Sequence, residues 1–100
     1  MNLSIADKLM LQRFFAGRPV KRAYVFGSYA RNEADKESDI DLLVELDYSK
    51  HIGMKFFSYR EELENLLHKK VDIVTDDGIS RHIKPHIDKD KILIYERSPE

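Results

Sequence analysis

The chain has 100 residues, 42% of them hydrophobic and 35% charged, which suits one soluble domain with a single core. Its formal net charge of −1 excludes a molecule-wide basic field for nucleic acid, so such a contact would need a local patch. The lack of cysteine excludes disulfides and thiolate metal sites. No signal-peptide pattern opens the chain and no apolar stretch approaches the ~20 residues that span a bilayer, so we expect a cytoplasmic protein without a membrane partner.

A helix followed by a strand is predicted at the N-terminus. Ser4 is suited to cap the helix, with Asp7 at its positive end, and Gly17 and Pro19 end it. The apolar residues of this segment recur with helical spacing: Ile5, Leu9, Met10 and Phe14. The next segment, 22–26, is short and rich in aromatic and β-branched residues, which predicts a strand.

A glycine-serine turn breaks this first strand. Gly27 and Ser28 are expected to open a short helix that runs through Arg31. A polar loop over 32–38 then leads into a second strand, 39–46.

The second half predicts two further helices and two further strands. Segment 54–69 is the longest predicted helix, with an apolar face made of Phe56, Tyr59, Leu63, Leu66 and Leu67. A third strand follows at 70–75, and Ser80 is expected to cap a short helix that Pro85 limits or kinks. The last strand is 91–95. Helices that alternate with strands predict an α/β (α+β) fold around one sheet.

Two acids of the second strand are the first candidates for chemistry. Asp39 and Asp41 are two positions apart, so on a strand they face the same way, with Cα atoms roughly 6–7 Å apart. Acids on a strand that reads as buried are costly unless a cation or hydrogen bonds compensate. Mg²⁺ prefers such hard oxygen ligands, and two ions ~3.5–4 Å apart can stabilise the attacking and the leaving oxygen of an in-line displacement.

Asp72 is the candidate for a third carboxylate. It stands inside an apolar strand, flanked by Val71 and Ile73. If this strand lies beside 39–46, Asp72 joins the same face as the two earlier acids. Its role, as a metal ligand or as the base for an incoming hydroxyl, is left open by the residues alone.

The glycine-serine turn is suited to bind phosphate. Gly27 permits a tight turn and a close approach of backbone N–H groups to an anion, and the start of a helix adds a favourable field. The Ser28 hydroxyl can donate to a phosphate, and Arg31, one turn on, can reach the same group with its guanidinium fork.

These residues carry a family resemblance. Gly27-Ser28, ten further residues and then Asp39-x-Asp41 resemble the signature of the DNA polymerase β-type nucleotidyltransferase superfamily. The chain length and the context of Ser38 to Leu42 resemble its minimal nucleotidyltransferase (MNT) branch. The resemblance implies one nucleotidyltransferase domain over 1–100, a mixed β-sheet with helices packed on it, and these roles: phosphate binding by Gly27, Ser28 and Arg31, and catalysis with metal binding by Asp39, Asp41 and Asp72.

One position departs from the family pattern. A glycine often follows the arginine in this family, whereas Asn32 stands here. Asparagine tolerates the left-handed backbone conformation, so we expect the turn to persist.

The resemblance also implies an activity and a partner. It implies a nucleotidyltransferase that transfers a nucleoside monophosphate from an NTP to an acceptor hydroxyl and releases pyrophosphate. The implied donor is ATP, in preference to other NTPs, and the implied cofactor is a pair of Mg²⁺ ions. Stand-alone MNT proteins act with a HEPN-domain toxin, which they can modify with AMP as its antitoxin. A chain this short has no part that would hold a nucleic-acid duplex as substrate, and homo- or hetero-oligomers are both compatible with it.

Two other functions remain open at this point. The chain could be a binding module that neutralises its partner by contact without turnover, or a nucleotidyltransferase for a small molecule. Of the histidines, His82 and His86 have a spacing that can bind zinc, which Pro85 between them disfavours. In Phe14-Phe15 and Phe56-Phe57 we expect one ring to face the core and the other to serve an interface.

Overall fold

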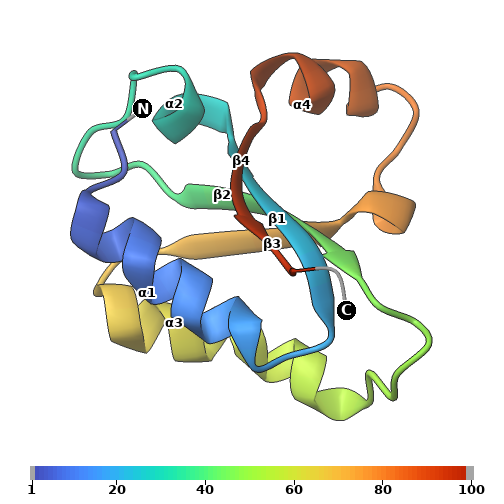
Figure 1. Ribbon diagram of the computed structural model, residues 1–100. Helices are drawn as coiled ribbons and strands as arrows, with labels where there is room; N and C mark the ends of the chain where they lie inside the picture. The colour runs from blue at the N-terminus through green and yellow to red at the C-terminus, as the bar shows by residue number, and fades with distance from the viewer. Residues whose placement is uncertain (1, 99–100) are drawn as a thin grey trace.

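The computed structural model describes residues 2–98, and its helices and strands follow the predicted order (Figure 1). The elements are α1 (Ile5–Ala16), β1 (Val20–Phe26), α2 (Gly27–Ala30), β2 (Ile40–Leu46), the 3-10 helix η1 (Met54–Ser58), α3 (Tyr59–Leu67), β3 (Val71–Thr75), the 3-10 helix η2 (Asp76–Gly78), α4 (Lys84–Asp90) and β4 (Ile92–Glu96). The predicted α/β (α+β) class is therefore confirmed.

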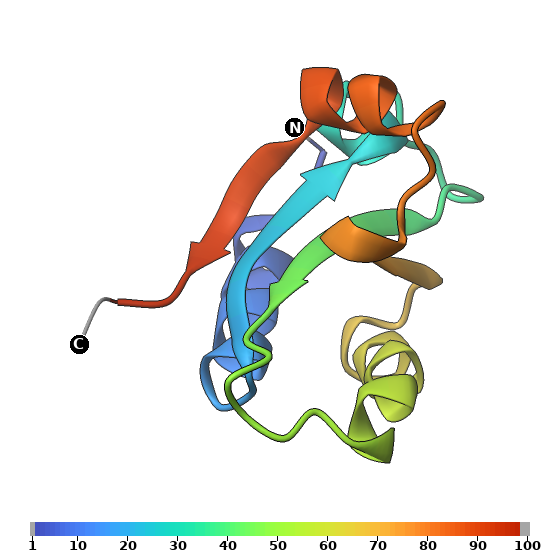
Figure 2. The ribbon, with the colours of Figure 1, turned by 90° about the vertical axis from the view of Figure 1, so that its right-hand side faces the viewer.

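The four strands form one mixed sheet in the order β3-β2-β1-β4. β1 pairs with β2 and with β4 in antiparallel orientation, whereas β2 and β3 are parallel. The parallel pair requires a crossover, which η1 and α3 supply. α1 and α3 lie side by side on one face of the sheet, and α2 and α4 lie next to each other at one end of it (Figures 1 and 2).

Strand β2 divides its side chains between the two faces of this sheet. Alternate residues, Ile40, Leu42 and Val44, are completely buried in the main core cluster beneath the two helices. The residues between them, including Asp41 and Glu45, point to the other face. This open face is where polar side chains of the sheet gather.

Helix α1 begins as predicted but buries another face. The backbone N–H of Asp7 donates to the Ser4 hydroxyl at 3.0 Å, which confirms the N-cap. Most of the predicted apolar set is on the outside, with the Ile5 side chain 81% exposed and Leu9 and Met10 also exposed. The buried residues are Leu11, Phe14 and Phe15. Apolar residues surround most of this helix, so its contacts with α3 and the sheet, and not spacing alone, select the buried side.

The prediction that only one of Phe14 and Phe15 faces inward is wrong. Both rings are buried, because α1 is covered by the sheet on one side and by α3 on the other. Phe15 packs near Tyr95 of β4, with ring centroids 6.1 Å apart. Phe14 meets Tyr59 edge-on at 5.4 Å, and the Arg18 guanidinium lies 3.6 Å above its ring centroid.

The long predicted helix 54–69 is two elements. The 3-10 helix η1 leads into α3, and His68 caps α3 in the left-handed conformation with φ 55°. Tyr59, Leu63 and Leu67 are buried as predicted, whereas Leu66 is exposed. The Phe57 ring is 74% exposed, which confirms the expectation of an outward ring for this second pair. Its service at an interface stays a prediction.

The helices of this fold are short. α1 has 12 residues, α3 nine, α4 seven and α2 four. Pro85 lies in the first turn of α4, where its missing N–H costs nothing, so it starts the helix without a kink. The expected cap by Ser80 is wrong, because α4 begins at Lys84 and its N-cap position is Ile83. Across residues 2–98, none of the helices combines the length and the apolar character needed to cross a membrane.

Candidate active site

Three acidic residues lie along the chain near one end of the sheet, at the starts of β2 and β3. In the parallel β2–β3 ladder, Asp41 stands directly opposite Asp72. Asp39 lies two residues before Asp41, just ahead of the first residue of β2. The sequence predicted that Asp72 would join the other two acids if its strand lay beside β2. β3 does pair with β2, so this condition is met. Asp41 is half-buried, whereas Asp39 and Asp72 are exposed, so only one of the three is withdrawn from solvent.

Asp41 is the most perturbed of these acids. Burial, together with the negative charges of Asp72 and Asp39, raises the pKa of Asp41 from 3.8 to about 6, and the positive charge of Arg31 opposes the shift. The clustered carboxylates thus carry negative charge that a cation would offset.

Gly27 meets Asp41 at the end of β1. Phe26 is paired with Asp41 in the antiparallel β1–β2 ladder, so the chain turns at Gly27 directly beside this carboxylate. Gly27 has φ +71°, and a Cβ there would overlap the Asp41 Oδ2 atom. Backbone conformation and space both require glycine at this position.

The turn after Gly27 closes on itself through the backbone. The Arg31 N–H donates to the Gly27 carbonyl at 3.1 Å, and the Glu33 N–H donates to the Ser28 carbonyl at 2.9 Å. Asn32 has φ 61°, so asparagine does adopt the left-handed conformation and the expectation that the turn persists is confirmed. With four residues, α2 supplies little of the helix field that the sequence suggested, and the turn itself presents the backbone.

Arg31 is held by two carboxylates. Its Nη1 donates to Asp90 Oδ2 at 2.6 Å, and its Nε donates to Glu33 Oε2 at 3.2 Å. These hydrogen bonds raise the pKa of Arg31 above its ordinary value, and the bond to Asp90 has the larger effect. Sequence reasoning missed Asp90, because only the pairing of β4 with β1 brings the end of α4 to this turn.

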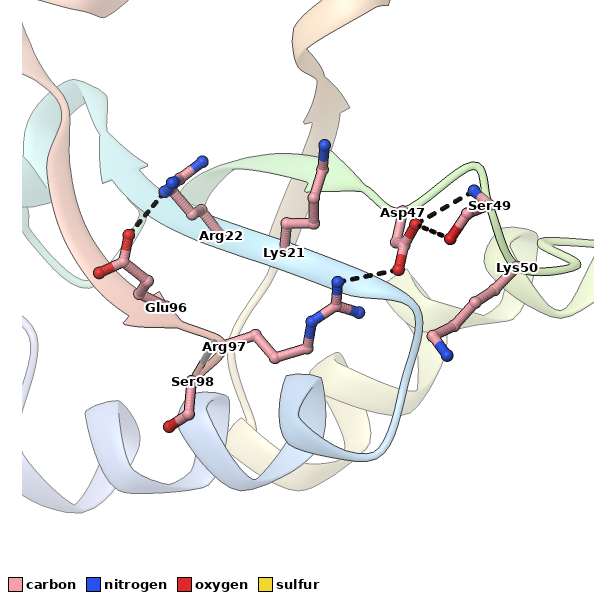
Figure 3. A pocket seen from close by; sticks show the side chains of 8 residues that line it. All are labelled: Lys21, Arg22, Asp47, Ser49, Lys50, Glu96, Arg97 and Ser98. Carbon is pink, nitrogen blue, oxygen red and sulfur yellow. Dashed lines mark hydrogen bonds and ion pairs between the residues drawn. The ribbon is translucent and has the colours of Figure 1, made fainter. Parts of the chain in front are cut away.

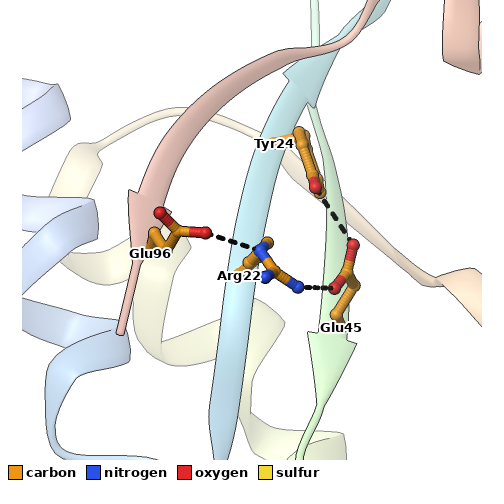
Figure 4. A network of polar contacts seen from close by, with 4 residues as sticks. All are labelled: Arg22, Tyr24, Glu45 and Glu96. Carbon is orange, nitrogen blue, oxygen red and sulfur yellow. Dashed lines mark hydrogen bonds and ion pairs between the residues drawn. The ribbon is translucent and has the colours of Figure 1, made fainter. Parts of the chain in front are cut away.

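A second polar network crosses the open face of the sheet (Figure 4). Arg22 donates through Nε to Glu96 at 2.7 Å and through Nη1 to Glu45 at 3.0 Å, while the Tyr24 hydroxyl donates to Glu45 at 3.0 Å. The network ties β4, β1 and β2 together. Arg22, at the start of the first predicted strand, is therefore paired with two carboxylates of the neighbouring strands.

A polar cavity of about 370 Å³ lies at the other end of the sheet, where β1 begins and β2 and β4 end (Figure 3). Its lining residues are Lys21, Arg22, Asp47, Ser49, Lys50, Glu96, Arg97 and Ser98. Hydrogen bonds from Ser49 and Arg97 lower the pKa of Asp47 to about 2. The cavity thus contains an ion pair that fixes the segment after β4, remote from the three carboxylates.

The chemistry of the three acids suits a hard divalent cation. Oxygen ligands and uncompensated negative charge are what Mg²⁺ binds, usually with few protein carboxylates and several substrate oxygens. Within residues 2–98 no three histidine, cysteine, aspartate or glutamate side chains already stand together as a metal site. The metal-binding role of Asp39, Asp41 and Asp72 therefore stays a prediction, which rests on the chemistry of their oxygens.

A known protein family covers the residues of this candidate site. The family model described as polymerase beta, nucleotidyltransferase, matches residues 10–100, which include all six candidate residues. A Methanocaldococcus jannaschii protein provisionally named a protein adenylyltransferase is 45% identical over 76 residues, which cover 75% of this chain and 76% of that protein.

Two solved structures share the fold. One, provisionally assigned as a minimal nucleotidyltransferase, has a TM-score of 0.73 and 31% identity, over 87% of this chain and 88% of that chain. The other comes from the complex of a tri-AMPylated HEPN toxin of Shewanella oneidensis with an MNT antitoxin. It has a TM-score of 0.69 and 16% identity, over 91% of this chain and 71% of that chain, a likeness that shows the fold alone.

Proposed function

The chain belongs to the polymerase beta nucleotidyltransferase family, and we propose that it transfers AMP from ATP to a hydroxyl group of a HEPN-domain partner, as the antitoxin of a toxin–antitoxin pair. The observation that carries this proposal is the direct pairing of Asp41 with Asp72, beside the glycine turn that ends β1. Acids from two strands thereby meet a turn suited to phosphate.

The acids and the turn divide the work. Asp39, Asp41 and Asp72 would hold Mg²⁺, which when bound stabilises charge on the attacking and leaving oxygens. Gly27 and Ser28 would bind the triphosphate through backbone N–H groups and the serine hydroxyl, with Arg31 beside them. The acceptor oxygen bonds to the α-phosphorus, the bond between the α- and β-phosphates breaks, and pyrophosphate leaves.

In this proposal Asp72 receives the proton of the acceptor hydroxyl. It is exposed on the open side of the sheet and stands opposite Asp41, so a hydroxyl that approaches from solvent reaches it. In this proposal Asp72 both completes the metal ligands and accepts the proton of the hydroxyl.

The comparisons support the choice of donor and acceptor. The archaeal relative is named for adenylyl transfer to protein, and the structurally similar chain comes from a complex with an AMPylated HEPN toxin. The match with the archaeal relative covers about three-quarters of that protein. The match with the chain from the HEPN complex covers most of the present chain.

The experiment co-expresses the chain with a candidate HEPN-domain protein from the same organism and supplies ATP labelled at the α-phosphate, with Mg²⁺. We expect label on the HEPN protein, loss of that label in Asp41→Asn, and full label in Asp76→Asn, a matched acid of the exposed η2 turn. Label that persists in Asp41→Asn contradicts the mechanism. Toxin neutralised by Asp41→Asn without any label indicates action by contact, and label on a small molecule instead indicates another acceptor.

A further inference from the structure

Asp90 lies beside the phosphate turn although it is 59 positions from Arg31 in the chain. It is the last residue of α4, and Ile92, two residues on, pairs with Val25 near the end of β1. Since β1 continues directly into Gly27, this pairing brings the end of α4 against α2 (Figures 1 and 2). The place of Asp90 is therefore set by the sheet.

Two contacts fix the Arg31 guanidinium. The shorter one, at 2.6 Å, joins Nη1 to Asp90, whose side chain is only 19% exposed, and the longer one, at 3.2 Å, joins Nε to the exposed Glu33. A guanidinium is a rigid planar fork, so two held nitrogens determine where the third one points. Among the hydrogen bonds of the described residues, those of Arg31 use Nε and Nη1, which leaves Nη2 for a ligand.

We propose that Asp90 is a positioning residue, which holds the Arg31 guanidinium so that its Nη2 donates to a phosphate oxygen of the bound nucleotide. The inference rests on the proposed function, because it requires a nucleotide at Gly27 and Ser28. The partial burial of Asp90 makes it the firmer of the two anchors, since an ion pair shielded from solvent is less screened than an exposed one.

Asp88 provides the matched control on the same helix. It is also an ion-paired aspartate, with Lys84 and Lys91 each at 2.9 Å, whereas the ion pairs of Arg31 within residues 2–98 go to Glu33 and Asp90. Asp88→Asn and Asp90→Asn thus remove the same charge from the same seven-residue helix, and only one of them releases Arg31.

The first measurement needs no nucleotide. Side-chain NMR of the Arg31 Nε–H group reports whether the guanidinium is held. We expect a protected signal in the wild type and in Asp88→Asn, and a signal averaged by exchange in Asp90→Asn. A longer carboxylate, in Asp90→Glu, should restore part of the protection.

The second measurement is calorimetric titration with Mg²⁺ and α,β-methylene-ATP, which the acceptor does not affect. Asp90→Asn should weaken binding by roughly threefold to fivefold, the range of one partly exposed ion pair, while Asp88→Asn leaves it unchanged. In the Arg31→Ala background, Asp90→Asn should have no further effect. In transfer assays the KM for ATP rises and kcat stays within twofold, about the scatter of such measurements.

Three results would overturn the inference. Equal weakening by Asp90→Asn with and without Arg31 shows that Asp90 acts elsewhere. Tighter binding in Asp90→Asn shows that Asp90 withholds Arg31 from the nucleotide. A wild-type chain that binds no nucleotide analogue rejects the proposed function as well, and so is distinguished from the first two results.

Discussion

Gly27, directly after β1, lies so close to Asp41 of β2 that any side chain on Gly27 would overlap the Asp41 carboxylate. The glycine turn and the acid pair, which are separate motifs in the sequence, are therefore one structural unit. The turn that is suited to phosphate also leaves the space for the most buried of the three candidate carboxylates.

Gly27→Ala is expected to abolish AMP transfer and to lower the free energy of unfolding by about 1–2 kcal/mol, because alanine is strained at φ +71° and its Cβ displaces Asp41. Gly17→Ala is the matched control, since a Cβ there meets nothing within 4 Å and the backbone φ is −94°. It should leave transfer unchanged and leave stability unchanged or slightly higher. Urea titrations and transfer assays on both variants test this. Transfer at the wild-type rate in Gly27→Ala would contradict the close fit.

Asp41→Asn is expected to stabilise the metal-free protein near neutral pH. The pKa of Asp41 is raised from 3.8 to about 6, so between about pH 4 and pH 6 the folded state binds more protons than the unfolded chain, and stability falls as pH rises through this window. Above about pH 6 the penalty is fully present, and the variant removes it, a gain on the order of 1 kcal/mol for a half-buried group.

The measurement is thermal unfolding with a chelator at several pH values. The difference between Asp41→Asn and wild type should be largest above about pH 6 and vanish below about pH 4. Asp39→Asn, which changes an exposed residue, should differ little from wild type near neutral pH. A variant that is less stable than wild type near neutral pH would show that the Asp41 carboxylate is compensated within the protein.

Mg²⁺ is expected to reverse this order of stability. A cation that binds the folded state stabilises it by mass action, about 2.7 kcal/mol when its concentration is a hundred times Kd. Mg²⁺ should therefore raise the melting temperature of wild type, and chelation should abolish AMP transfer. Asp41→Asn and Asp72→Asn should respond weakly, whereas Asp76→Asn should respond like wild type. Equal shifts in all four proteins would place the bound cation elsewhere.

How far the sequence predicts this site depends on the range of the contacts. The Ser4 cap, the turn at Gly27 and the alternation of β2 are local, and each is confirmed because a few neighbouring residues determine it. The position of Asp72 opposite Asp41 depends on one non-local fact, that β3 pairs with β2, and could be stated only as a condition.

Contacts between distant segments explain what the sequence did not predict. Asp90 reaches Arg31 only through the pairing of β4 with β1, and no spacing in the sequence signals it. The buried face of α1 is also set by distant contacts, since Leu11 and Phe15 are buried by elements that follow later in the chain. Hydrophobic period identifies a helix more reliably than it identifies the side that the rest of the protein covers.

Asp47→Asn is expected to flatten the acid side of the stability curve. Hydrogen bonds from Ser49 and an ion pair with Arg97 at 2.8 Å lower the pKa of Asp47 from 3.8 to about 2. This contribution is fully present above about pH 4 and is lost as pH falls to about 2. Unfolding followed between those pH values should show a shallower loss in Asp47→Asn than in wild type.

The two phenylalanine pairs give a direct test of how α1 packs. Phe15 has no exposed surface and Phe14 very little, so either change to alanine leaves a cavity, at a cost of about 3–5 kcal/mol for Phe15 and somewhat less for Phe14, whose ring is partly covered by the flexible Arg18. Phe57→Ala changes an exposed ring and should stay within about 0.5 kcal/mol. Urea denaturation of the three variants, at equal m-values, measures these differences. A Phe14→Ala variant as stable as Phe57→Ala would show that α3 does not cover this side of α1 in solution.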